Sequence, residues 1–258
     1  MDIRLDGRVA LITGGSKGLG FAMAREFSTS GAEVVIVARD AATLASAKTD
    51  LAKTAAGRIE TVAADVAEAA GIKKAFDAAM GAFGRIDIVV NNAGKAETAK
   101  FEDVTDAVWQ ADLDLKLFAA IRLTRLVFPQ MKQRKWGRVI NVLNTGAKTP
   151  GAGSAPTTVS RAAGMALTKV LAGEGAPHNV LVNALLVGLI ESDQWVRRAR
   201  AANASYEETI KAMGAKLPLG RMGTAEEFAN IACFLASDAA GYSNGTAINV
   251  DGGASPAV

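Results

Sequence analysis

The chain has 258 residues, of which 50% are hydrophobic and 21% are charged. This apolar content is too high for a largely disordered chain, and a net charge of only +3 gives no electrostatic case for nucleic-acid binding. A single cysteine, Cys233, and a single histidine, His178, exclude an internal disulfide and the usual Cys/His zinc sites. We expect one domain over residues 1–258, with no metal and no nucleic-acid partner.

Hydropathy gives no sign of a membrane segment. No apolar run approaches the roughly 18–20 residues that a membrane span requires. The first residues, Met1 to Arg8, carry charges where a signal peptide requires an apolar stretch. We therefore expect a cytoplasmic protein.

Short runs rich in β-branched residues alternate with helix-length segments along the chain. The runs are mostly apolar on both faces, which is typical of parallel strands covered by helices on both sides. The predicted strands are Val9–Thr13, Glu33–Ala38, Ile59–Ala63, Ile86–Val90, Arg138–Leu143, Val180–Leu185 and Thr246–Val250. The predicted helices include Phe21–Ser30, Ala41–Ala55, Ala67–Phe83, Asp106–Lys135 and Thr158–Glu174. The pattern predicts an α/β fold, a doubly wound, Rossmann-type parallel sheet of about seven strands with helices on both faces.

The alternation is interrupted between Val187 and Met222. A polar helical segment, Ser192–Met213, stands there before the last helix and strand. Long insertions after a strand often cover a substrate. We expect a substrate lid over about residues 188–222.

The first predicted strand runs into a glycine-rich turn, Gly14-x-x-x-Gly18-x-Gly20, which is followed by a helix. Glycines at such a turn let the backbone approach a pyrophosphate, whose charge is stabilised at the helix N-terminus. The alternative is an ordinary glycine turn between a strand and a helix. The order of strand, glycines and helix favours a dinucleotide site.

Several motifs together resemble those of the single-domain short-chain dehydrogenase/reductase family. They are Thr13-Gly14 with Gly18 and Gly20, Asp65, Asn91-Asn-Ala-Gly94, Gly220-Arg-Met-Gly223, Glu226-Glu227 and Asp251-Gly-Gly253, and they cover nearly the whole chain. The resemblance implies that Asp65 binds the adenine amino group and that the Asn91–Gly94 backbone packs on the adenosine. The alternative for Asp65 is a helix N-cap. The full set of cofactor contacts implied is Gly14, Ser16, Lys17, Gly18, Leu19, Gly20, Arg39, Asp65, Val66, Asn91, Ala93, Gly94, Arg161, Gly188 and Ile190.

The end of the second strand sets the choice between the two nicotinamide cofactors. Relatives that prefer NAD usually place an acid there on the ribose hydroxyls, but this chain has Ala38 followed by Arg39. Lys17 in the glycine turn adds a second cation, so the pair suits a 2′-phosphate and NADP(H). A register shift of one residue would bring Asp40 to the ribose and favour NAD(H). A further alternative is that Lys17 and Arg39 are only solvated surface charges.

The catalytic end departs from the family pattern at every position. The resemblance implies a tyrosine acid/base, a lysine four residues later, a serine 13 residues before the tyrosine, and an asparagine on the preceding long helix. Aligning Ser160-Arg-Ala-Ala163 places Thr157 at the tyrosine, Arg161 at the lysine and Asn144 at the serine. Asp114 falls at the asparagine. A threonine hydroxyl does not ionise near neutral pH, and an arginine does not give up its proton. Val187 also replaces the proline that usually precedes Gly188.

Other residues are weaker candidates for the missing proton donor. Tyr206 in the predicted lid and Lys148 after Asn144 are more simply a packing residue and a surface charge, respectively. Tyr242 is expected to be structural, and His178 lies at the sheet edge opposite the site.

Three functions remain open from the sequence. The first is an NADP(H)-dependent oxidoreductase of a small carbonyl or hydroxyl compound with an atypical acid/base set. The second is a non-redox lyase or hydrolase that reuses the pocket, and the third is a catalytically silent nucleotide-binding homologue. Relatives pair their long helices across two-fold axes, so we expect a homotetramer.

Overall fold

The computed structural model describes residues 3–192, 196 and 205–258. Within this part, seven parallel strands form one sheet in the order β3-β2-β1-β4-β6-β8-β9. The strands are β1 (Val9–Thr13), β2 (Glu33–Ala38), β3 (Ile59–Ala63), β4 (Ile88–Asn91), β6 (Gly137–Asn144), β8 (Val180–Val187) and β9 (Ala247–Val250). The order reverses between β1 and β4, which makes the carboxyl ends of these strands the expected ligand crevice. The predicted doubly wound sheet is confirmed.

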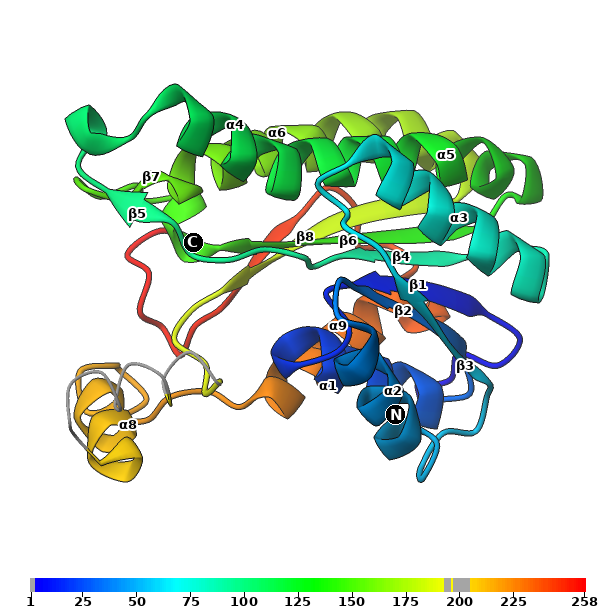
Figure 1. Cartoon of the computed structure of the whole chain (residues 1–258), viewed down its shortest axis with the longest axis horizontal. Coiled ribbons are helices and arrows are strands. Elements are labelled where there is room, and N and C mark those ends of the chain that lie inside the picture. Colours follow the sequence, from blue (N-terminus) through cyan, green and yellow to red (C-terminus); the bar gives the residue numbers. More distant parts are fainter. Residues whose placement is uncertain (1–2, 193–195, 197–204) are drawn as a thin grey trace.

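Helices cover both faces of the sheet, as Figure 1 shows. One layer consists of α1 (Gly18–Thr29), α2 (Ala41–Leu51) and α9 (Ala225–Ala236), and the other of α3 (Ala69–Phe83), α4 (Asp106–Leu113), α5 (Ala119–Arg134) and α6 (Thr157–Gly175). The apolar sides of the two layers form separate cores against the sheet. Phe27 and Phe228 are fully buried in one, and Leu123 and Val127 in the other. Two buried faces explain why the strands are apolar throughout.

The long helix predicted over Asp106–Lys135 is divided. Residues Asp114–Phe118 form a π-helical segment between α4 and α5. A π segment widens one turn, and such segments occur frequently at functional sites. A short antiparallel pair, β5 (Thr98–Ala99) and β7 (Ala155–Pro156), lies beside the start of α6 and was not predicted from the sequence.

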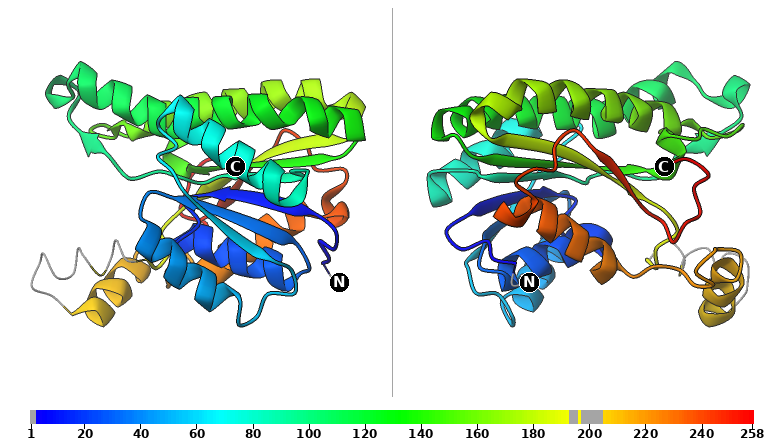
Figure 2. Two further views of the ribbon diagram at one scale, coloured as in Figure 1. Left: turned by 45° about the vertical axis from the view of Figure 1, so that its right-hand side comes forward. Right: turned by 180° about the vertical axis from the view of Figure 1, so that it is seen from behind.

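The predicted lid falls partly outside the described residues, which exclude 193–195 and 197–204. Its described part includes α8 (Tyr206–Gly214), which projects away from the sheet and its helices in all three views (Figures 1 and 2). Within the described ranges, no helix is both long and apolar enough to cross a lipid bilayer.

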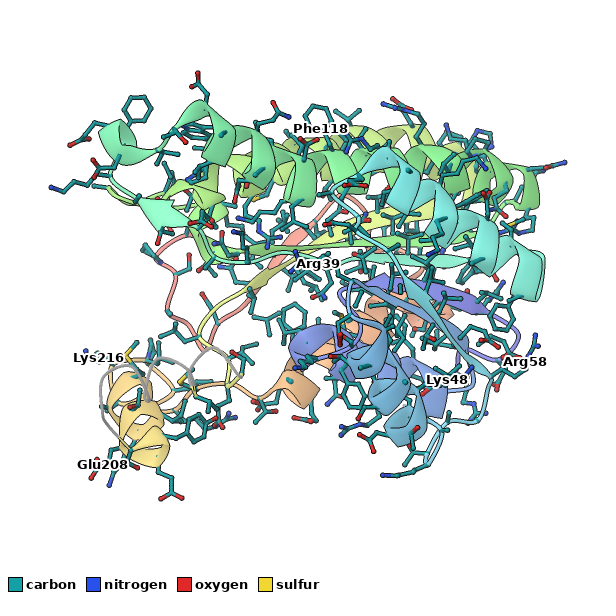
Figure 3. The ribbon with its side chains drawn as sticks, in the orientation of Figure 1. Arg39, Lys48, Arg58, Phe118, Glu208 and Lys216 are labelled. Carbon is teal, nitrogen blue, oxygen red and sulfur yellow. The ribbon has the colours of Figure 1, made fainter. Side chains whose placement is uncertain are left out.

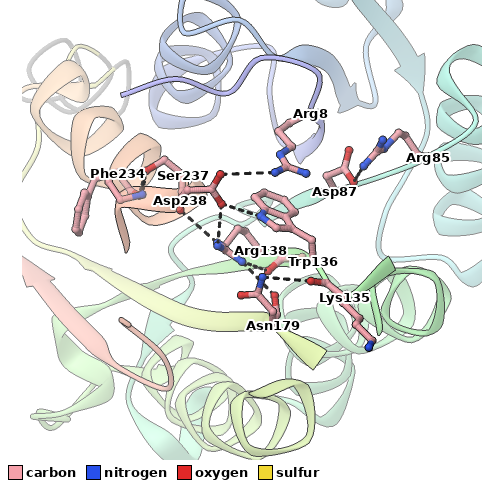
Figure 4. Close-up of polar contacts among 12 residues, drawn as sticks. Arg8, Arg85, Asp87, Lys135, Trp136, Arg138, Asn179, Phe234, Ser237 and Asp238 are labelled. Carbon is pink, nitrogen blue, oxygen red and sulfur yellow. Dashed lines mark hydrogen bonds and ion pairs between the residues drawn. The ribbon is translucent and has the colours of Figure 1, made fainter. Parts of the chain in front are cut away.

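A cluster of charged side chains closes the sheet at the end opposite the ligand crevice (Figure 4). Arg138, which is 2% exposed, donates to backbone carbonyls and approaches the carboxylate of Asp238 at 3.4 Å. Burial lowers the pKa of Arg138 to about 10. The Trp136 indole donates to the same carboxylate at 2.8 Å, while Arg8 stacks on the indole ring. These contacts tie β6 to the segment after α9, so this end of the sheet serves stability.

Candidate active site

The glycine turn lies at the carboxyl end of β1. Gly14 and Gly18 have φ values of +67° and +55°, which favour glycine. A Cβ on Gly20 would collide with the carbonyl oxygen of Gly14, so the turn can close onto α1 only with glycine there. Gly18 begins α1, and Lys17, Ser16 and Leu19 stand at its exposed or half-buried entrance. The helix N-terminus is therefore open to an anionic group.

A buried hydroxyl fixes the glycine turn to β4. Thr13 Oγ1 donates to the carbonyl of Val90 at 3.3 Å and accepts the backbone N–H groups of Asn92 and Ala93 at 3.0 and 3.1 Å. The amide of Asn92 donates to the carbonyls of Thr13 and Gly14. The side chain of Asn91 instead donates to Asn141 on β6, at 2.8 Å. The Asn91–Gly94 segment thus offers backbone, rather than the Asn91 amide, to a ligand.

Two exposed cations and an engaged carboxylate mark the end of β2. The strand ends at Ala38, and Arg39 follows it as an exposed side chain, labelled in Figure 3. Asp40 is the N-cap of α2, where one carboxylate oxygen accepts the backbone N–H and the hydroxyl of Thr43 at 2.8 and 2.6 Å. These bonds lower the pKa of Asp40, as does the charge of nearby Lys17. The Asp40 carboxylate is therefore occupied at the helix end.

The adenine side is formed by the turn after β3. Asp65 accepts the backbone N–H of Ala67 at 3.0 Å, and Val66 is buried. Glu68, not Asp65, occupies the N-cap position of α3. Asp65 is therefore not the helix cap: a local turn holds its carboxylate three residues before the cap.

The predicted contacts Gly188 and Ile190 lie in the segment that follows β8. Gly188 packs against Asp251 so closely that a Cβ would collide with it. Ile190 is buried and pairs with Gly223 in an isolated parallel bridge. Ile190 also lines a pocket of about 300 Å³, which is closed by the Asp251–Gly253 turn and by the ion pair of Arg221 with Glu227. Thr157, Arg161 and Asn144 do not line this pocket.

Thr157 begins α6, and its hydroxyl is fully used. It donates to the carbonyl of Glu97 at 2.7 Å and accepts the Glu97 backbone N–H at 2.9 Å and the Lys116 ammonium at 2.8 Å. A hydroxyl has one donor and two acceptor positions, so all three are filled. Thr157 is 4% exposed. In this arrangement Thr157 joins α6 to the β5 segment and has no proton to offer a substrate.

Arg161 lies one turn further along α6, and its guanidinium crosses to the Asn91–Gly94 segment. Nη1 donates to the carbonyl of Val142. A Cβ on Gly94 would stand 2.6 Å from Nη2, so this close approach requires glycine. Burial lowers the pKa of Arg161 to about 10. Its Nε is buried without a hydrogen-bond partner among the described residues, a donor that a bound group would satisfy.

Asp114 is not brought into this group. Its carboxylate accepts from Arg122 at 3.0 Å and from Gln110 at 2.8 Å, on another side of the π segment. Lys116 takes the position beside Thr157 instead, paired with Asp112, and both side chains are 1% exposed. Ser160 donates to the second oxygen of Asp112 at 2.6 Å.

Lys116 and Asp112 were not predicted from the sequence as site residues. The available signal was their spacing, an acid and a base four residues apart within a helix next to the aligned position. A buried pair of this kind has to be explained, because burying either charge alone is costly.

The remaining candidates lie apart from one another. Asn144 ends β6, and its Oδ1 is buried with no hydrogen-bond partner in the described structure. Lys148 is half-buried and directly follows the short 3-10 turn Thr145–Ala147. Tyr206 donates to Glu191 at 3.3 Å, beyond β8. Tyr242 is fully exposed, and His178 precedes the start of β8.

Comparison with known proteins decides the family. Residues 14–255 match the model of the family described as Enoyl-(Acyl carrier protein) reductase. The chain belongs to the short-chain dehydrogenase/reductase family of oxidoreductases. A curated relative, the 3-oxoacyl-[acyl-carrier-protein] reductase FabG of Aquifex aeolicus, is 32% identical over 253 residues, covering 98% of this chain and 99% of its own length.

Two solved structures of short-chain reductases are close in fold. The L-sorbose reductase of Gluconobacter frateurii, complexed with NADPH and L-sorbose, has a TM-score of 0.96 at 34% identity, over 100% of both chains. An NADPH-bound short-chain oxidoreductase of Pseudomonas aeruginosa PAO1, described as containing an atypical catalytic center, has a TM-score of 0.91 at 34% identity, over 99% of both chains. The expected family is confirmed.

Proposed function

We propose that the chain is an NADP(H)-dependent reductase of a small carbonyl compound that works with an atypical acid/base set. The observation that carries the proposal is the end of β2, where Lys17 and Arg39 are exposed and the adjacent acid, Asp40, already accepts both donors of Thr43. A 2′-phosphate brings two negative charges that two free cations stabilise, whereas NAD(H) relatives offer an acid to the ribose. The NADPH complexes of two structural relatives support the same choice.

The residues present fit a dinucleotide along the carboxyl ends of β1, β2 and β4. The Gly14–Gly20 turn would hold the pyrophosphate at the start of α1, and Asp65 with Val66 would hold the adenine side. Arg161 would hold the nicotinamide ribose, since its Nε is a buried donor that still lacks an acceptor. The bound cofactor would supply the hydride, and Gly188 and Ile190 would border its nicotinamide end.

Calorimetric titration of NADPH and NADH into the wild type and Arg39→Ala tests the cofactor choice. A hydrogen bond to a charged group contributes about 1.5–3 kcal/mol, so we expect Arg39→Ala to weaken NADPH binding about 10- to 100-fold and to leave NADH binding nearly unchanged. Lys53→Ala is the matched control, because it removes the same charge just beyond the other end of α2. Equal affinity of the wild type for both cofactors would refute the proposal.

Turnover separates the reductase from its alternatives. NADPH oxidation should be followed with L-sorbose and with acetoacetyl-CoA, the latter a 3-oxoacyl thioester, because relatives act on these two classes of carbonyl. Reduction of either supports the redox function. Tight NADPH binding without turnover on a broad carbonyl panel would favour a silent nucleotide-binding homologue, and the absence of NADPH binding would favour a non-redox enzyme.

We further propose a homotetramer. Apolar side chains are exposed on the helical layer that contains α4, α5 and α6. Phe118, labelled in Figure 3, is 37% exposed, and Val159 and Val170 on α6 are 50% and 57% exposed. The edge strand β9 offers a second surface, because its residues are only half-buried. Light scattering at micromolar concentration should find four chains together. A species of 26.6 kDa would contradict this proposal.

A further inference from the structure

A buried ion pair occupies the catalytic end of the site. The Lys116 ammonium contacts Asp112, and both side chains are 1% exposed. Asp112 also accepts the Ser160 hydroxyl at 2.6 Å, and the ammonium donates to Thr157 at 2.8 Å. Three residues from α4 and α6 therefore hold the one amine of the π segment. Removing either partner of such a pair is strongly destabilising, so its position is well determined.

The neighbouring side chains leave Lys116 as the group that can exchange a proton. Thr157 donates its only proton to a backbone carbonyl and does not ionise near neutral pH. Arg161 keeps its proton near neutral pH, because even after burial its pKa is about 10. Asn144 is an amide and does not titrate. A lysine ammonium does titrate, and burial is the usual way in which proteins bring it into a useful range.

Gly94 lets Lys116 and Arg161 lie side by side against the Asn91–Gly94 segment. A Cβ at Gly94 would stand 2.6 Å from Arg161 Nη2 and 3.7 Å from Lys116 Cγ. The stem of Lys116 thus passes Gly94, in the segment that would border the cofactor, and its amine contacts Thr157, the residue aligned with the family's tyrosine. This is the region that a reacting carbonyl oxygen has to reach.

We propose that Lys116 is the general acid of the reduction and that Asp112 and Ser160 are its positioning residues. This inference rests on the proposed reductase function. The carbonyl carbon gains a hydride with its electron pair from the reduced nicotinamide, the C=O π bond breaks, and the oxygen takes a proton from the Lys116 ammonium. The neutral amine then takes a proton from water, and in the direction of oxidation it accepts the hydroxyl proton.

Electrostatics agrees with this role. Burial lowers the pKa of Lys116, against the raising effects of the hydrogen bond and charge of Asp112; Arg161 lowers it further and Glu97 raises it. These charged groups face the amine from α4, from α6 and from the segment before β5. Because the acid form is the protonated one, reduction should slow as the pH rises through a pKa below the ordinary 10.5. The rate of the reverse oxidation should instead rise with pH through the same pKa, because the neutral amine is then the base.

The test compares Lys116→Met and Lys116→Arg with the wild type. General acid catalysis contributes about 10²–10⁴-fold, so we expect both variants to lose kcat by that factor while NADPH affinity changes by less than about threefold. Lys116→Arg keeps the charge and the partner of Asp112, which preserves folding but removes the exchangeable proton. The matched control is Lys73→Met, which breaks an exposed lysine–aspartate pair of the same four-residue spacing.

A second readout does not depend on turnover. The Nζ resonance of Lys116, measured in protein labelled with [15N]lysine and assigned by its loss in Lys116→Arg, should titrate below 10.5 and at the pH of the kcat limb. A titration at or above 10.5, or a kcat retained within about threefold in both variants, would overturn the assignment of Lys116 alone. A wild type that neither binds NADPH nor reduces either probe would overturn the proposed function, and this inference with it.

Discussion

Replacing Thr157 with valine tests whether its hydroxyl is structural. Valine has nearly the same shape, so the change removes the oxygen and leaves two donors without their partner: the Glu97 N–H and one N–H of the Lys116 ammonium. The Glu97 carbonyl loses the hydroxyl but still accepts the Thr157 backbone N–H at 3.3 Å. Each buried group left unsatisfied costs about 1–3 kcal/mol. Glu97 is only half-buried, so water can reach its backbone and the lower value applies to its N–H.

The expected loss in the free energy of unfolding is about 3 kcal/mol, about 1 for the Glu97 N–H and about 2 for the N–H of the buried ammonium. For a chain of this size, such a loss lowers Tm by about 6–12 °C. Chemical denaturation and thermal melting should both be measured at one fixed protein concentration, because association of subunits would stabilise the folded state. Thr157→Ser, which keeps the oxygen and removes one methyl group, should cost only about 1 kcal/mol.

Thr49→Val is the matched control. Thr49 lies on α2 and its exposed hydroxyl donates only to the carbonyl one turn back, at 3.1 Å. Surface changes of this kind stay within about 0.5 kcal/mol. If Thr157→Val costs no more than Thr49→Val, the three hydrogen bonds do not hold α6 to the β5 segment, and the view of Thr157 as a structural residue is refuted.

Three further predictions concern regions outside the catalytic group. Asp87 is fully buried and its carboxylate accepts from Val9, Arg85 and Arg134. Chemical denaturation should show that Asp87→Asn lowers the free energy of unfolding by about 3 kcal/mol. The control is Asp77→Asn, whose partner is the exposed Lys73 and which should lower it by less than about 0.5 kcal/mol. Burial raises the pKa of Cys233 to about 11, so a disulfide reagent at pH 8 should label it only on unfolding; rapid labelling of the native protein would contradict this. The hydrogen bond from Arg221 lowers the pKa of Glu227 from 4.5 to about 2, so its stabilising effect is present above 4.5 and is lost as the pH falls towards 2. The difference in Tm between the wild type and Glu227→Gln should therefore shrink from pH 7 to pH 3.

The sheet could be predicted from the sequence because its physics is local. Strands such as Val9–Thr13 and Glu33–Ala38 are buried on both faces, so β-branched runs mark them clearly and their predicted ends agree with the structure. The glycine turn was readable for the same reason, since a positive φ at Gly14 requires that residue type. The contribution of Thr13 was not readable, because its hydroxyl partners lie in β4 and the turn after it, about 80 residues away in the chain.

The catalytic end could not be derived in the same way. The motif Leu113-Asp-Leu-Lys116 placed Asp114 at the asparagine, but both Asp114 and Lys116 lie in the π segment, where a regular helical period does not show which side chain faces α6. The fold turns Lys116 to Thr157 and leaves Asp114 with Arg122. Which polar side chain of a helix is buried depends on such tertiary contacts, not on the residue pattern alone.

Restoring the tyrosine and lysine of the family tests whether these substitutions form one set. Thr157 is 4% exposed and contacts the Lys116 ammonium, so a larger side chain at this position meets that ammonium. Thr157→Tyr with Arg161→Lys alone therefore places a phenol against a buried charge pair. Adding Lys116→Asn and Asp112→Asn removes both charges together, so neither is left unpaired. The phenol can then be tuned by the new lysine from its ordinary pKa of about 10. We expect the fourfold variant, in which the phenol replaces the Lys116 ammonium as the proton donor, to reduce carbonyl probes with NADPH at least about 10-fold faster than the double variant, in which the phenol and the ammonium compete for one space and neither is in position, because general acid catalysis contributes about 10²–10⁴-fold. Calorimetry should show similar NADPH affinity in both. A double variant as active as the fourfold one would mean that Lys116 does not occupy the space that the tyrosine needs, and that the four positions changed independently.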